Sequence, residues 1–384
     1  MKRILFVINS MEIGGTRRSL LNLLDVISRR SDVECSLLVF SPYGEYINEI
    51  PENVYICRTN RDLIAMFSSS SALLKRKQYL TWFRKFLLSV KKKLFGEKKV
   101  MQTIYQKHIR KNDLSYDMIV GFQEGGCNDY TALTGAGKKI FWIHNNYENL
   151  TELAHGYPES YEAADSINFV AVASMESFAK AMPAFADKMR VIKNVLPQEL
   201  IRKQAEVPCA NIFNKDCIHL VSVGRIADQK GFDRLTEAAK RLKSDGLDFE
   251  WIILGEGKDK EKLVDFTKEN GLSEYVRFIG AKPNPYPYIN QSDLYVLTSR
   301  YESQPMVLME ALTIGVPVLS TSFDSVNEIV QNRDFALTVE NSTEGIYKGL
   351  SELIQNPSKI GDMKKNTAKF DYDNEKIIRQ ILSL

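Results

Sequence analysis

Arg300-Tyr-Glu302-Ser-Gln-Pro-Met-Val-Leu-Met-Glu310-Ala-Leu-Thr-Ile-Gly315-Val-Pro317-Val is the most informative segment of this chain, with two glutamates eight residues apart. The apolar run Asp293-Leu-Tyr-Val-Leu-Thr298 precedes it and is typical of a buried strand. The apolar residues around Glu310 predict a helix that ends at Gly315. We therefore expect Glu302 at a strand-to-helix turn, two helical turns from Glu310. Free N–H groups at such a helix N-terminus favour an anion such as a diphosphate.

The two glutamates also have a simpler interpretation, as a surface residue before a helix and a solvated residue within it. Glu310, however, is surrounded in sequence by apolar residues from Leu308 to Leu312. A carboxylate in such a stretch needs a partner when it is buried. We therefore interpret both carboxylates as groups that reach the hydroxyls of a ligand held over the helix N-terminus.

Short apolar runs alternate with helical stretches along the whole chain, which indicates βα units and parallel sheets. In the first half the predicted strands are Ile4–Ile8, Val33–Phe40, Met118–Gly121, Lys139–Ile143, Phe169–Ala173 and Arg190–Ile192. In the second half they are Ile218–Val223, Trp251–Leu254, Val276–Ile279, Leu294–Leu297, Val318–Ser320 and Ala336–Val339. Each set makes one doubly wound α/β domain, and 384 residues suit two domains.

Three ordered segments carry a resemblance to a known family. They are Val221-Ser-Val-Gly224-Arg225-Ile-Ala-Asp-Gln-Lys230-Gly231, then Trp251-Ile-Ile-Leu254-Gly255-Glu-Gly257 followed by Val276-Arg-Phe278-Ile-Gly280, and finally the segment with Glu302 and Glu310. Across residues 217–355 their order and spacing resemble the retaining glycosyltransferases of family 4, with their Glu-x7-Glu signature. The N-terminal half resembles this family more weakly, through Gly14-Gly15, His144 and Val191-Ile-Lys-Asn194. The resemblance implies a GT-B fold, in which two Rossmann-like domains with parallel sheets face a cleft.

We expect the chain to divide into four segments. Residues 1–195 form an acceptor-side domain with a basic helical insertion at 72–111. Residues 196–216, which include Pro197 and Pro208, form a linker. Residues 217–370 form a nucleotide-sugar-binding domain, and a terminal helix at 371–384 crosses back to the first domain.

The resemblance also implies roles for the charged residues of the C-terminal half. The cations Arg225 and Lys230 would bind the donor diphosphate, since a planar fork and a point charge both suit phosphate oxygens. Glu310 would accept the ribose hydroxyls. Glu302 would face the donor sugar and help to stabilise positive charge at its anomeric carbon. Two exposed loop cations without function are the alternative for Arg225 and Lys230.

Further residues are assigned to the donor on weaker grounds. The resemblance places Gly255, Gly280, Ser303, Gln304 and Met306 beside it, and sets His144 against the donor sugar or the acceptor. Gly14 and Gly15 join the first strand to the first helix, where two glycines let backbone approach a ligand. A tight turn is the alternative for these glycines, and a structural role is the alternative for His144. The family usually has Gly-Phe-Gly after the first glutamate. Here Pro305 follows Ser303-Gln304 and has no N–H to offer.

Composition excludes several classes of function. Apolar residues make up 44% and charged residues 26% of the chain, and a net charge of +3 argues against nucleic-acid binding by the whole chain. Five scattered cysteines without C-x-x-C spacing are typical of reduced cytoplasmic thiols, and four scattered histidines indicate no zinc site. We therefore expect no metal and no cofactor. The apolar run at the N-terminus ends at Ile8, which is too short for a signal peptide.

Residues 72–111 are the one compositional anomaly, with thirteen basic residues against Glu97 alone. At helical spacing Tyr79, Phe83, Phe86, Leu87, Val90 and Leu94 form one stripe, with Lys77, Arg84, Lys85, Lys91 and Lys92 opposite. One interpretation is an insertion that packs on the domain and leaves a solvated basic face. The other is an interfacial helix on the anionic inner leaflet of the cell membrane.

The sequence therefore predicts a retaining, metal-independent glycosyltransferase, cytoplasmic or peripheral on the inner face of the membrane. Its expected donor is a nucleotide-sugar, a UDP-sugar above all, and its expected acceptor is a glycan, lipid-linked in surface polysaccharide synthesis. A non-catalytic GT-B protein that binds nucleotide or glycan is one alternative. A nucleotide-sugar epimerase on the same fold is the other.

Overall fold

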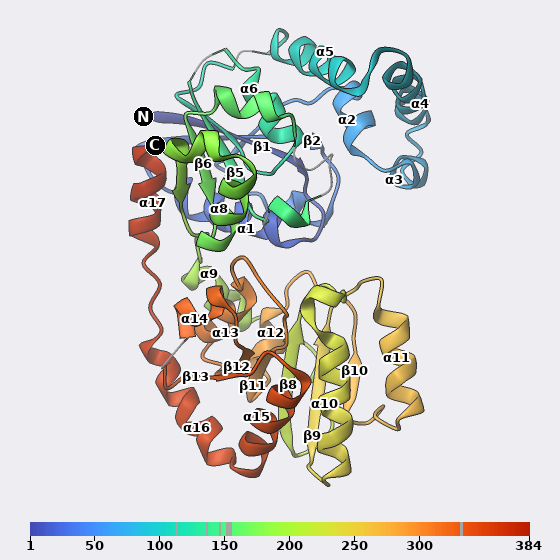
Figure 1. Cartoon of the computed structure of the whole chain (residues 1–384), viewed down its shortest axis with the longest axis vertical. Helices are drawn as coiled ribbons and strands as arrows, with labels where there is room; N and C mark the ends of the chain where they lie inside the picture. Colours follow the sequence, from blue (N-terminus) through green and yellow to red (C-terminus); the bar gives the residue numbers. More distant parts are fainter. Residues whose placement is uncertain (113, 136, 146, 151–155, 331–332) are drawn as a thin grey trace. The chain divides into compact units, whose positions relative to one another are not determined.

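The computed structural model describes residues 1–112, 114–135, 137–145, 147–150, 156–330 and 333–384. The chain divides into two compact units. The N-terminal unit contains Met1–Val195 together with Asn374–Leu384, and the C-terminal unit contains Leu196–Asp373. Figure 1 shows both units with their helices and strands labelled.

The N-terminal unit is built on a sheet whose strand order is β3-β2-β1-β4-β5-β6-β7, with every described pair parallel. Its strands are β1 (Lys2–Ser10), β2 (Val33–Ser41), β3 (Tyr55–Ile56), β4 (Met118–Gly121), β5 (Lys138–Ile143), β6 (Ser166–Phe169) and β7 (Met189–Val191). The centre of β1, Ile4–Ile8, is fully buried. Parallel sheets are covered on both faces, which explains why β1 is apolar without alternation.

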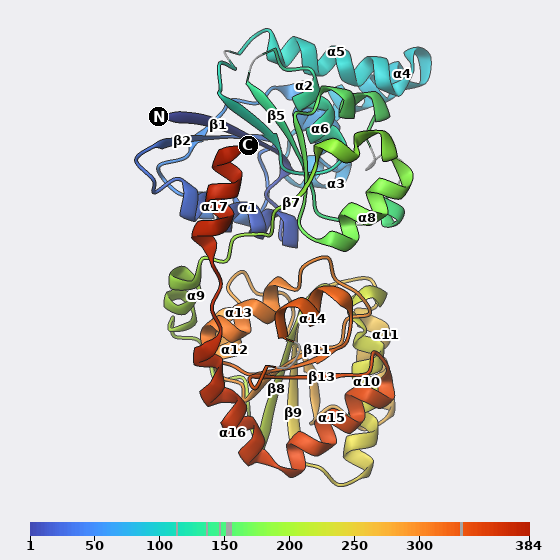
Figure 2. The same ribbon diagram turned by 60° about the vertical axis from the view of Figure 1, so that its left-hand side comes forward.

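Helices connect these strands. They are α1 (Gly15–Ile27), α2 (Arg61–Phe67), α3 (Ser70–Lys75), α4 (Tyr79–Phe95), α5 (Glu97–Ile109), α6 (Gly126–Ala132) and α8 (Val172–Ala181), with short 3-10 turns at η1 (Glu45–Glu49), η2 (Tyr147–Asn149), η3 (Pro158–Ala163) and η4 (Pro183–Lys188). The C-terminal helix α17 (Asn374–Ser383) belongs to this unit, and Figure 2 shows it beside α1. The Lys2 ammonium donates to the carbonyl of Leu382 at 2.7 Å, which ties α17 to the start of β1.

The C-terminal unit has a second parallel sheet, with strand order β10-β9-β8-β11-β12-β13. Its strands are β8 (Ile218–Val223), β9 (Phe249–Leu254), β10 (Val276–Phe278), β11 (Leu294–Leu297), β12 (Val318–Thr321) and β13 (Ala336–Val339). Its helices are α9 (Gln198–Ala205), α10 (Phe232–Ser244), α11 (Lys260–Glu269), α12 (Tyr286–Asn290), α13 (Met306–Ile314), α14 (Asp324–Val330), α15 (Thr343–Gln355) and α16 (Pro357–Asn366), with 3-10 turns at η5 (Asp228–Lys230) and η6 (Thr367–Lys369).

Two separate cores cover the faces of this second sheet. Leu220, Trp251 and Val296 face one way and pack with α10, α11, α15 and α16. Their neighbours Val221, Ile252 and Leu297 face the other way and pack with α9, α12, α13 and α14. Successive side chains of a strand point to opposite faces, so each strand supplies both cores. Both units are doubly wound α/β folds, which confirms the predicted fold class. The expectation that the two sheets face a cleft stays a prediction.

Most predicted strands lie where the structure has them, and one does not. The fifth predicted strand was expected at Phe169–Ala173, but the corresponding strand β6 is Ser166–Phe169 and α8 begins at Val172. The polar residues Ser166 and Asn168 interrupt the apolar run of β6, so the apolar pattern did not indicate a strand there. Both are buried, and the Ser166 hydroxyl donates to the Asn168 side chain at 2.8 Å. The short edge strand β3 was not predicted at all.

The expected linker, residues 196–216, is part of the C-terminal unit. Within it lies α9, which contacts α12 and α13. Leu196, Ile201 and Phe213 are buried in the same core as the sheet. The two prolines and mixed polarity of this stretch therefore reflect a packed amphipathic segment, not a free connection.

The basic segment at residues 72–111 forms the end of α3 together with α4 and α5. A packed insertion was expected to bury its apolar stripe and expose its basic face, and α4 has the opposite orientation. The stripe with Tyr79, Phe83 and Phe86 is exposed, while Arg84 and Lys85 face the unit. Among the described residues, no helix has the length and apolar character needed to cross a membrane. All five cysteines are free thiols.

Candidate functional site

The C-terminal sheet reverses its strand order between β8 and β11. In open α/β sheets ligands bind outside the carboxyl ends of the strands at such a switch point. The loop after β8 carries Arg225 and Lys230, and the loop after β11 carries Glu302. Sequence positions more than 70 apart therefore meet at the place where this fold binds ligands.

Lys230 and Glu302 form the centre of this site. The Lys230 ammonium lies 2.5 Å from Oε1 of Glu302, and the Ser299 hydroxyl donates to the same oxygen at 2.7 Å. Both charged side chains are mostly buried. The Ser325 hydroxyl donates to the carbonyl of Glu302 at 2.7 Å and fixes the backbone of this residue. The ammonium and the carboxylate therefore lie together as an ion pair. A charged ligand can replace either group as the partner of the other.

The two loops are joined by further contacts. The Arg300 guanidinium forms an ion pair with Asp233 at 2.7 Å and donates to the carbonyl of Asp228 at 2.5 Å. The Arg300 amide donates to the carbonyl of Gln229 at 2.8 Å. Because a bidentate guanidinium is a rigid connector, the Lys230 loop and the Glu302 loop are fixed relative to each other.

Glu310 is only 3% exposed, on the second turn of α13. Pro305 is the N-cap of this helix, and Gly315 closes it with φ of +96°. Gln304 donates from its amide to the Tyr372 hydroxyl at 2.9 Å, while Met306 begins the helix. The segment thus forms the predicted strand-turn-helix, with both glutamates at the carboxyl side of β11.

Two glycines place the neighbouring loops close together. A side chain on Gly255 would meet the carbonyl oxygen of Gly224 at 1.9 Å, and the Gly255 amide donates to the carbonyl of Gly280 at 3.1 Å. Gly280 itself has φ of +78°. The loops after β8, β9 and β10 are therefore in direct contact beside Arg225, which is exposed. Close packing against the Gly224 carbonyl therefore requires glycine at position 255, with or without a ligand contact.

Gly231 offers a stability test of the Lys230 loop. It has φ of +65°, and a side chain there would meet the carbonyl oxygen of Thr298 at 2.1 Å. We expect Gly231→Ala to lower the free energy of unfolding by about 2 kcal/mol or more, because a left-handed backbone and a clash with backbone act together. Chemical denaturation measures this loss. The control is Gly361→Ala in α16, which meets no atom within 4 Å and should be neutral or stabilising. Equal stability of the two variants would contradict the strained loop.

The N-terminal unit places His144 directly after β5, buried against the ring of Phe122 at 4.8 Å between centroids. Burial, more than the nearby Arg17, lowers the pKa of His144 to about 3, so its ring is neutral near pH 7. One ring nitrogen bonds the backbone of Phe122, while Nε2 has no hydrogen-bond partner in the described structure. A buried unsatisfied nitrogen needs an explanation, and a substrate hydroxyl would provide one.

The loop below His144 is held by Glu124, which is buried. One oxygen of Glu124 accepts from the amides of His144 and Asn145 at 2.5 and 2.7 Å. Burial raises the pKa of Glu124, and these hydrogen bonds oppose the shift. Glu124 therefore positions the His144 loop, a role that the sequence did not reveal.

Gly14 and Gly15 lie at the N-terminus of α1. A side chain on Gly15 would meet no atom within 4 Å, and one on Gly14 would only touch Arg17 at ordinary contact distance. Neither glycine has φ in the left-handed region. Packing and turn geometry therefore do not require glycine here, and the role of these two residues in ligand binding stays a prediction.

Some functional neighbours were missed from the sequence. Ser299, Ser325 and the Arg300–Asp233 pair hold Glu302 and its loop in place, yet no spacing rule identifies them. Their partners are distant in sequence, except for Ser299, which lies three residues from Glu302. Only Ser299 offered a signal, since a hydroxyl close to a turn carboxylate is a common partner for it.

The structure also brings together three residues with metal-binding side chains, although their sequence spacing indicated no site. Ligand atoms of Cys217, His219 and Glu250 lie within 4.8 Å of one another. Glu250, however, pairs with Arg277 at 3.0 Å and accepts two backbone amides, while His219 donates to the carbonyl of Lys215. A cation would have to displace the guanidinium, so this cluster is a satisfied polar network. His155 lies outside the described residues.

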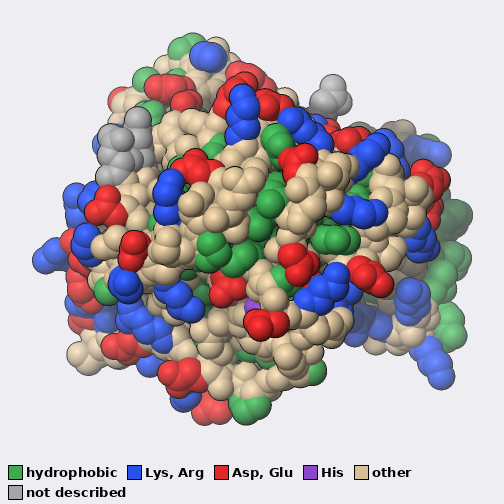
Figure 3. Space-filling view, turned by 90° about the horizontal axis from the view of Figure 1, so that it is seen from below, with side chains coloured by type: hydrophobic (Ala, Val, Ile, Leu, Met, Phe, Trp, Pro, Cys, Tyr) green, Lys and Arg blue, Asp and Glu red, His purple; other side chains and the backbone are tan. Residues whose placement is uncertain are grey.

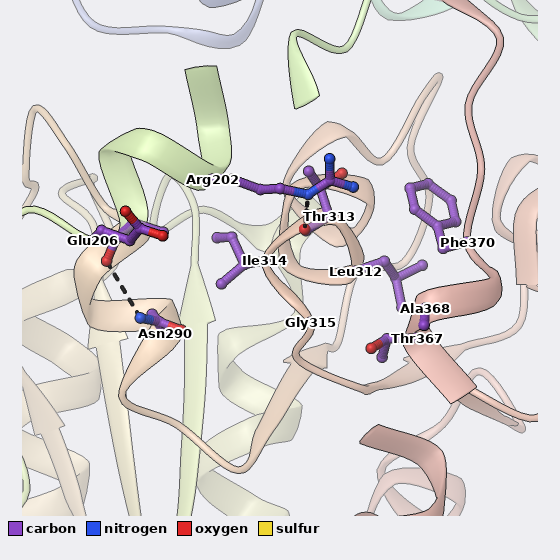
Figure 4. Close-up of a pocket in the computed structure, with 11 residues that line it drawn as sticks. Arg202, Glu206, Asn290, Leu312, Thr313, Ile314, Gly315, Thr367, Ala368 and Phe370 are labelled. Carbon is purple, nitrogen blue, oxygen red and sulfur yellow. Dashed lines mark hydrogen bonds between the residues drawn. The ribbon is translucent and has the colours of Figure 1, made fainter. Parts of the chain in front are cut away.

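A pocket of about 380 Å³ lies at the opposite end of α13 from Glu302 (Figure 4). Arg202 reaches into it from α9 and donates to the carbonyl of Thr313 at 3.2 Å. Asn290 donates to the carbonyl of Ala205 at 3.3 Å. None of the residues predicted to bind donor lines this pocket. The guanidinium neutralises the negative end of the helix, which is a structural role.

Comparison with known proteins gives a family match in the C-terminal unit. Residues 205–370 match the sequence model of the glycosyl transferases group 1. The chain is 29% identical to an uncharacterized glycosyltransferase of Methanocaldococcus jannaschii, over 59% of this chain and 62% of that protein. It is also 29% identical to the N-acetylgalactosamine-N,N'-diacetylbacillosaminyl-diphospho-undecaprenol 4-alpha-N-acetylgalactosaminyltransferase of Campylobacter jejuni, over 63% of this chain and 66% of that protein. The matched stretch thus spans less than two thirds of each relative.

Solved structures show the same fold over nearly the whole chain. TarM of S. aureus superimposes with a TM-score of 0.73 and 14% identity, covering 100% of this chain and 98% of that protein. Anabaena HepE in complex with UDP gives a TM-score of 0.67 and 17% identity, with both chains fully covered. The match to the glycosyl transferases group 1 therefore covers residues 205–370, and the solved structures show a shared fold over nearly the whole chain.

Proposed function

We propose that this chain is a retaining glycosyltransferase that moves a sugar from a nucleotide-sugar, a UDP-sugar above all, to a glycan acceptor. The observation that carries the proposal is the Lys230–Glu302 pair at the switch point of the C-terminal sheet. The group 1 match of residues 205–370 supports the reaction class. HepE was solved with UDP and with UDP-glucose, which supports a UDP-sugar donor.

In this proposal the donor diphosphate lies at the carboxyl ends of β8 and β11. Lys230 exchanges its bond to Glu302 for one to a phosphate oxygen, and the exposed Arg225 binds the same group. As the bond between sugar and phosphate breaks, these fixed cations stabilise the negative charge that develops on the leaving diphosphate. Glu302, released from Lys230 but still held by Ser299, faces the positive charge that develops at the anomeric carbon.

The rest of the donor binds along α13 and the adjoining loops. Glu310 accepts hydrogen bonds from the ribose hydroxyls, which would give its buried carboxylate a ligand. Gly255 and Gly280 bring backbone to the nucleotide, and Ser303, Gln304 and Met306 line the sugar. Pro305 cannot donate an N–H, so recognition of the donor sugar at this position relies on side chains. Retention of configuration and membership of family 4, with its Glu-x7-Glu signature, rest on the resemblance of the sequence.

The reaction is proposed to need no metal and no cofactor, because the two cations can do the work of a divalent ion. We expect activity to be unchanged after incubation with excess EDTA and gel filtration. The measurement is the initial rate of UDP release from the donor in the presence of acceptor. A loss of rate that Mg²⁺ or Mn²⁺ restores would overturn this expectation.

The acceptor is assigned to the N-terminal unit, where neutral His144 and the Gly14–Gly15 turn offer a hydrogen-bond acceptor and open backbone. A lipid-linked glycan is the preferred acceptor, because the C. jejuni relative is named for a diphospho-undecaprenol substrate and an E. coli relative for colanic acid biosynthesis. Such an acceptor would bring a cytoplasmic enzyme to the inner face of the membrane.

Two other functions would use the same fold. A non-catalytic protein that binds nucleotide or glycan would not need a lysine and a carboxylate held together at the reacting position. A nucleotide-sugar epimerase would need a further acid–base pair beside the sugar. The retained Lys230, Arg225, Glu302 and Glu310 favour transfer over both.

A thermal unfolding screen tests the donor. UDP-, GDP-, ADP- and dTDP-sugars are each added to the protein, and the shift in Tm is compared with that for the free nucleotide. A ligand at about 100 times its Kd stabilises the folded state by about 2.7 kcal/mol, which raises Tm by a few degrees. The proposal predicts protection by one class of nucleotide-sugar, and it fails if none protects.

A further inference from the structure

Helix α4 presents an apolar stripe to solvent. The six residues at helical spacing, Tyr79, Phe83, Phe86, Leu87, Val90 and Leu94, are all exposed, and Leu94 is 71% exposed. Among the described residues, ten of the seventeen exposed large apolar side chains lie within residues 74–95. A contiguous exposed apolar patch of this kind marks an interaction surface.

The opposite face of α4 explains this orientation. Arg84 forms a bidentate ion pair with Asp62 of α2, with contacts of 2.5 and 3.2 Å. Lys85 donates to the carbonyls of Ala65 and Ser68 at the C-terminal end of α2, where a helix favours a cation. Thr81 and Leu88 are the buried residues of α4. The helix is thus attached through charges and hydrogen bonds, which leaves its apolar face without cover from described residues.

Three lysines, one each on α3, α4 and α5, have no ion pairs of their own among the described residues. Lys75, Lys93 and Lys99 are exposed and form none of the ion pairs found among the described residues. In Figure 3, hydrophobic side chains gather at the right-hand edge, in the more distant part of the view, beside basic ones. Figure 1 places α3 and α4 on this side of the N-terminal unit.

We propose that α4 is an interfacial helix that inserts its apolar stripe into the surface of an anionic phospholipid bilayer. Helices that lie in a membrane surface combine an apolar face rich in aromatic and leucine residues with an abundance of lysine and arginine on their polar face. The lysines attract anionic headgroups, and the apolar stripe enters the boundary between headgroups and acyl chains. The contact needs no spanning helix.

The charge of the segment favours a bilayer over a second protein. Protein interfaces are depleted in lysine relative to the rest of the surface. Residues 72–111 contain thirteen basic residues against Glu97 alone, so a second copy of this chain would bring like charges together around the stripe. An anionic membrane neutralises the same charges.

This inference deepens the proposed function and rests on it for its purpose, since a lipid-linked acceptor lies at the same surface. The two are tested separately, because vesicle binding is measured without donor or acceptor. Lys230→Ala, which should disable transfer, is expected to bind vesicles as the wild type does. A chain that binds vesicles but transfers no sugar would refute the function alone.

Trp82 makes the contact measurable in the unmodified protein. It belongs to α4 and is 37% exposed, while Trp142 and Trp251 are fully buried. Vesicles of phosphatidylcholine with phosphatidylglycerol should shift its emission to shorter wavelength, and lipids brominated on their acyl chains should quench it. Trp82→Phe should remove the quenching and keep the binding.

Matched variants separate insertion from attraction by charge. Phe83→Gln, Phe86→Gln and Leu94→Gln together should weaken vesicle binding at least about tenfold, because each removes apolar area from the buried face. Lys75→Gln, Lys93→Gln and Lys99→Gln together should weaken binding to anionic vesicles and reduce its dependence on salt. Tyr55→Gln with Ile56→Gln, an exposed apolar pair on β3, is the control and should bind as wild type.

Cosedimentation with neutral and anionic vesicles at low and high salt measures all four proteins, after circular dichroism has shown that each is folded. The proposal is overturned if wild type ignores anionic vesicles at low salt, or if the apolar triple variant binds them as wild type does. It is also overturned if wild type self-associates through the stripe in analytical ultracentrifugation and binds no vesicles.

Discussion

Lys230→Ala should lower the rate of sugar transfer about 10²–10³-fold, and Arg225→Ala should do the same. Removing one preorganised electrostatic stabiliser of a transition state costs roughly 2.7–4 kcal/mol. Lys230 is held beside Glu302 in the ligand-free site, so its loss also leaves a mostly buried carboxylate without its ammonium partner. Arg225 forms no such pair among the described residues, and its effect should come from the donor alone.

Single-turnover measurements with saturating donor give these rates. Lys359→Ala is the control, because Lys359 pairs with Glu352 at the surface of the same unit, far in sequence from the site. It should retain wild-type activity. If both site variants transferred sugar within about threefold of wild type, the cations would not act on the leaving diphosphate.

The two glutamates should separate binding from chemistry. Glu310→Gln should weaken binding of the free nucleotide about tenfold or more, because a hydrogen bond to a charged group contributes roughly 1.5–3 kcal/mol. Glu302→Gln should leave nucleotide binding nearly unchanged and slow transfer about 10²-fold or more. The ribose is remote from the reacting carbon, so its partner contributes similarly to the ground state and the transition state.

Calorimetry with the free nucleotide and steady-state kinetics distinguish the two roles. Ser299→Ala is an informative companion, since it removes one partner of the Glu302 carboxylate and keeps its charge. We expect Ser299→Ala to slow transfer less than Glu302→Gln does. The opposite assignment of the glutamates would follow if Glu302→Gln abolished nucleotide binding while Glu310→Gln affected only the rate.

The fold was predictable because buried parallel strands are continuous apolar runs with sharp boundaries. The runs at Ile218–Val223 and Leu294–Leu297 coincide with β8 and β11, and the strand-turn-helix around Glu302 lies where its apolar period and Gly315 indicate. Strand β6 was misplaced because its buried polar residues Ser166 and Asn168, which are joined by a hydrogen bond, interrupt the apolar pattern on which the prediction relied.

The site was predictable where a motif specifies it and not where distant contacts build it. The ion pair of Lys230 with Glu302 joins residues 72 positions apart, and no short-range sequence pattern indicates such a contact. The sequence left the orientation of α4 open between two interpretations for a related reason. Its amphipathic pattern shows two faces, but the ion pair with Asp62 and the helix end of α2 decide which face turns inward.

The stereochemical outcome of transfer tests the central claim most directly. A nucleotide-sugar with an α-linked sugar, chosen by the thermal screen, is incubated with a panel of undecaprenyl-diphosphate-linked glycans, and proton NMR records the new anomeric linkage. We predict an α-linked product, formed by wild type and nearly lost in Lys230→Ala. A β-linked product, or transfer that survives Lys230→Ala unchanged, would contradict the account.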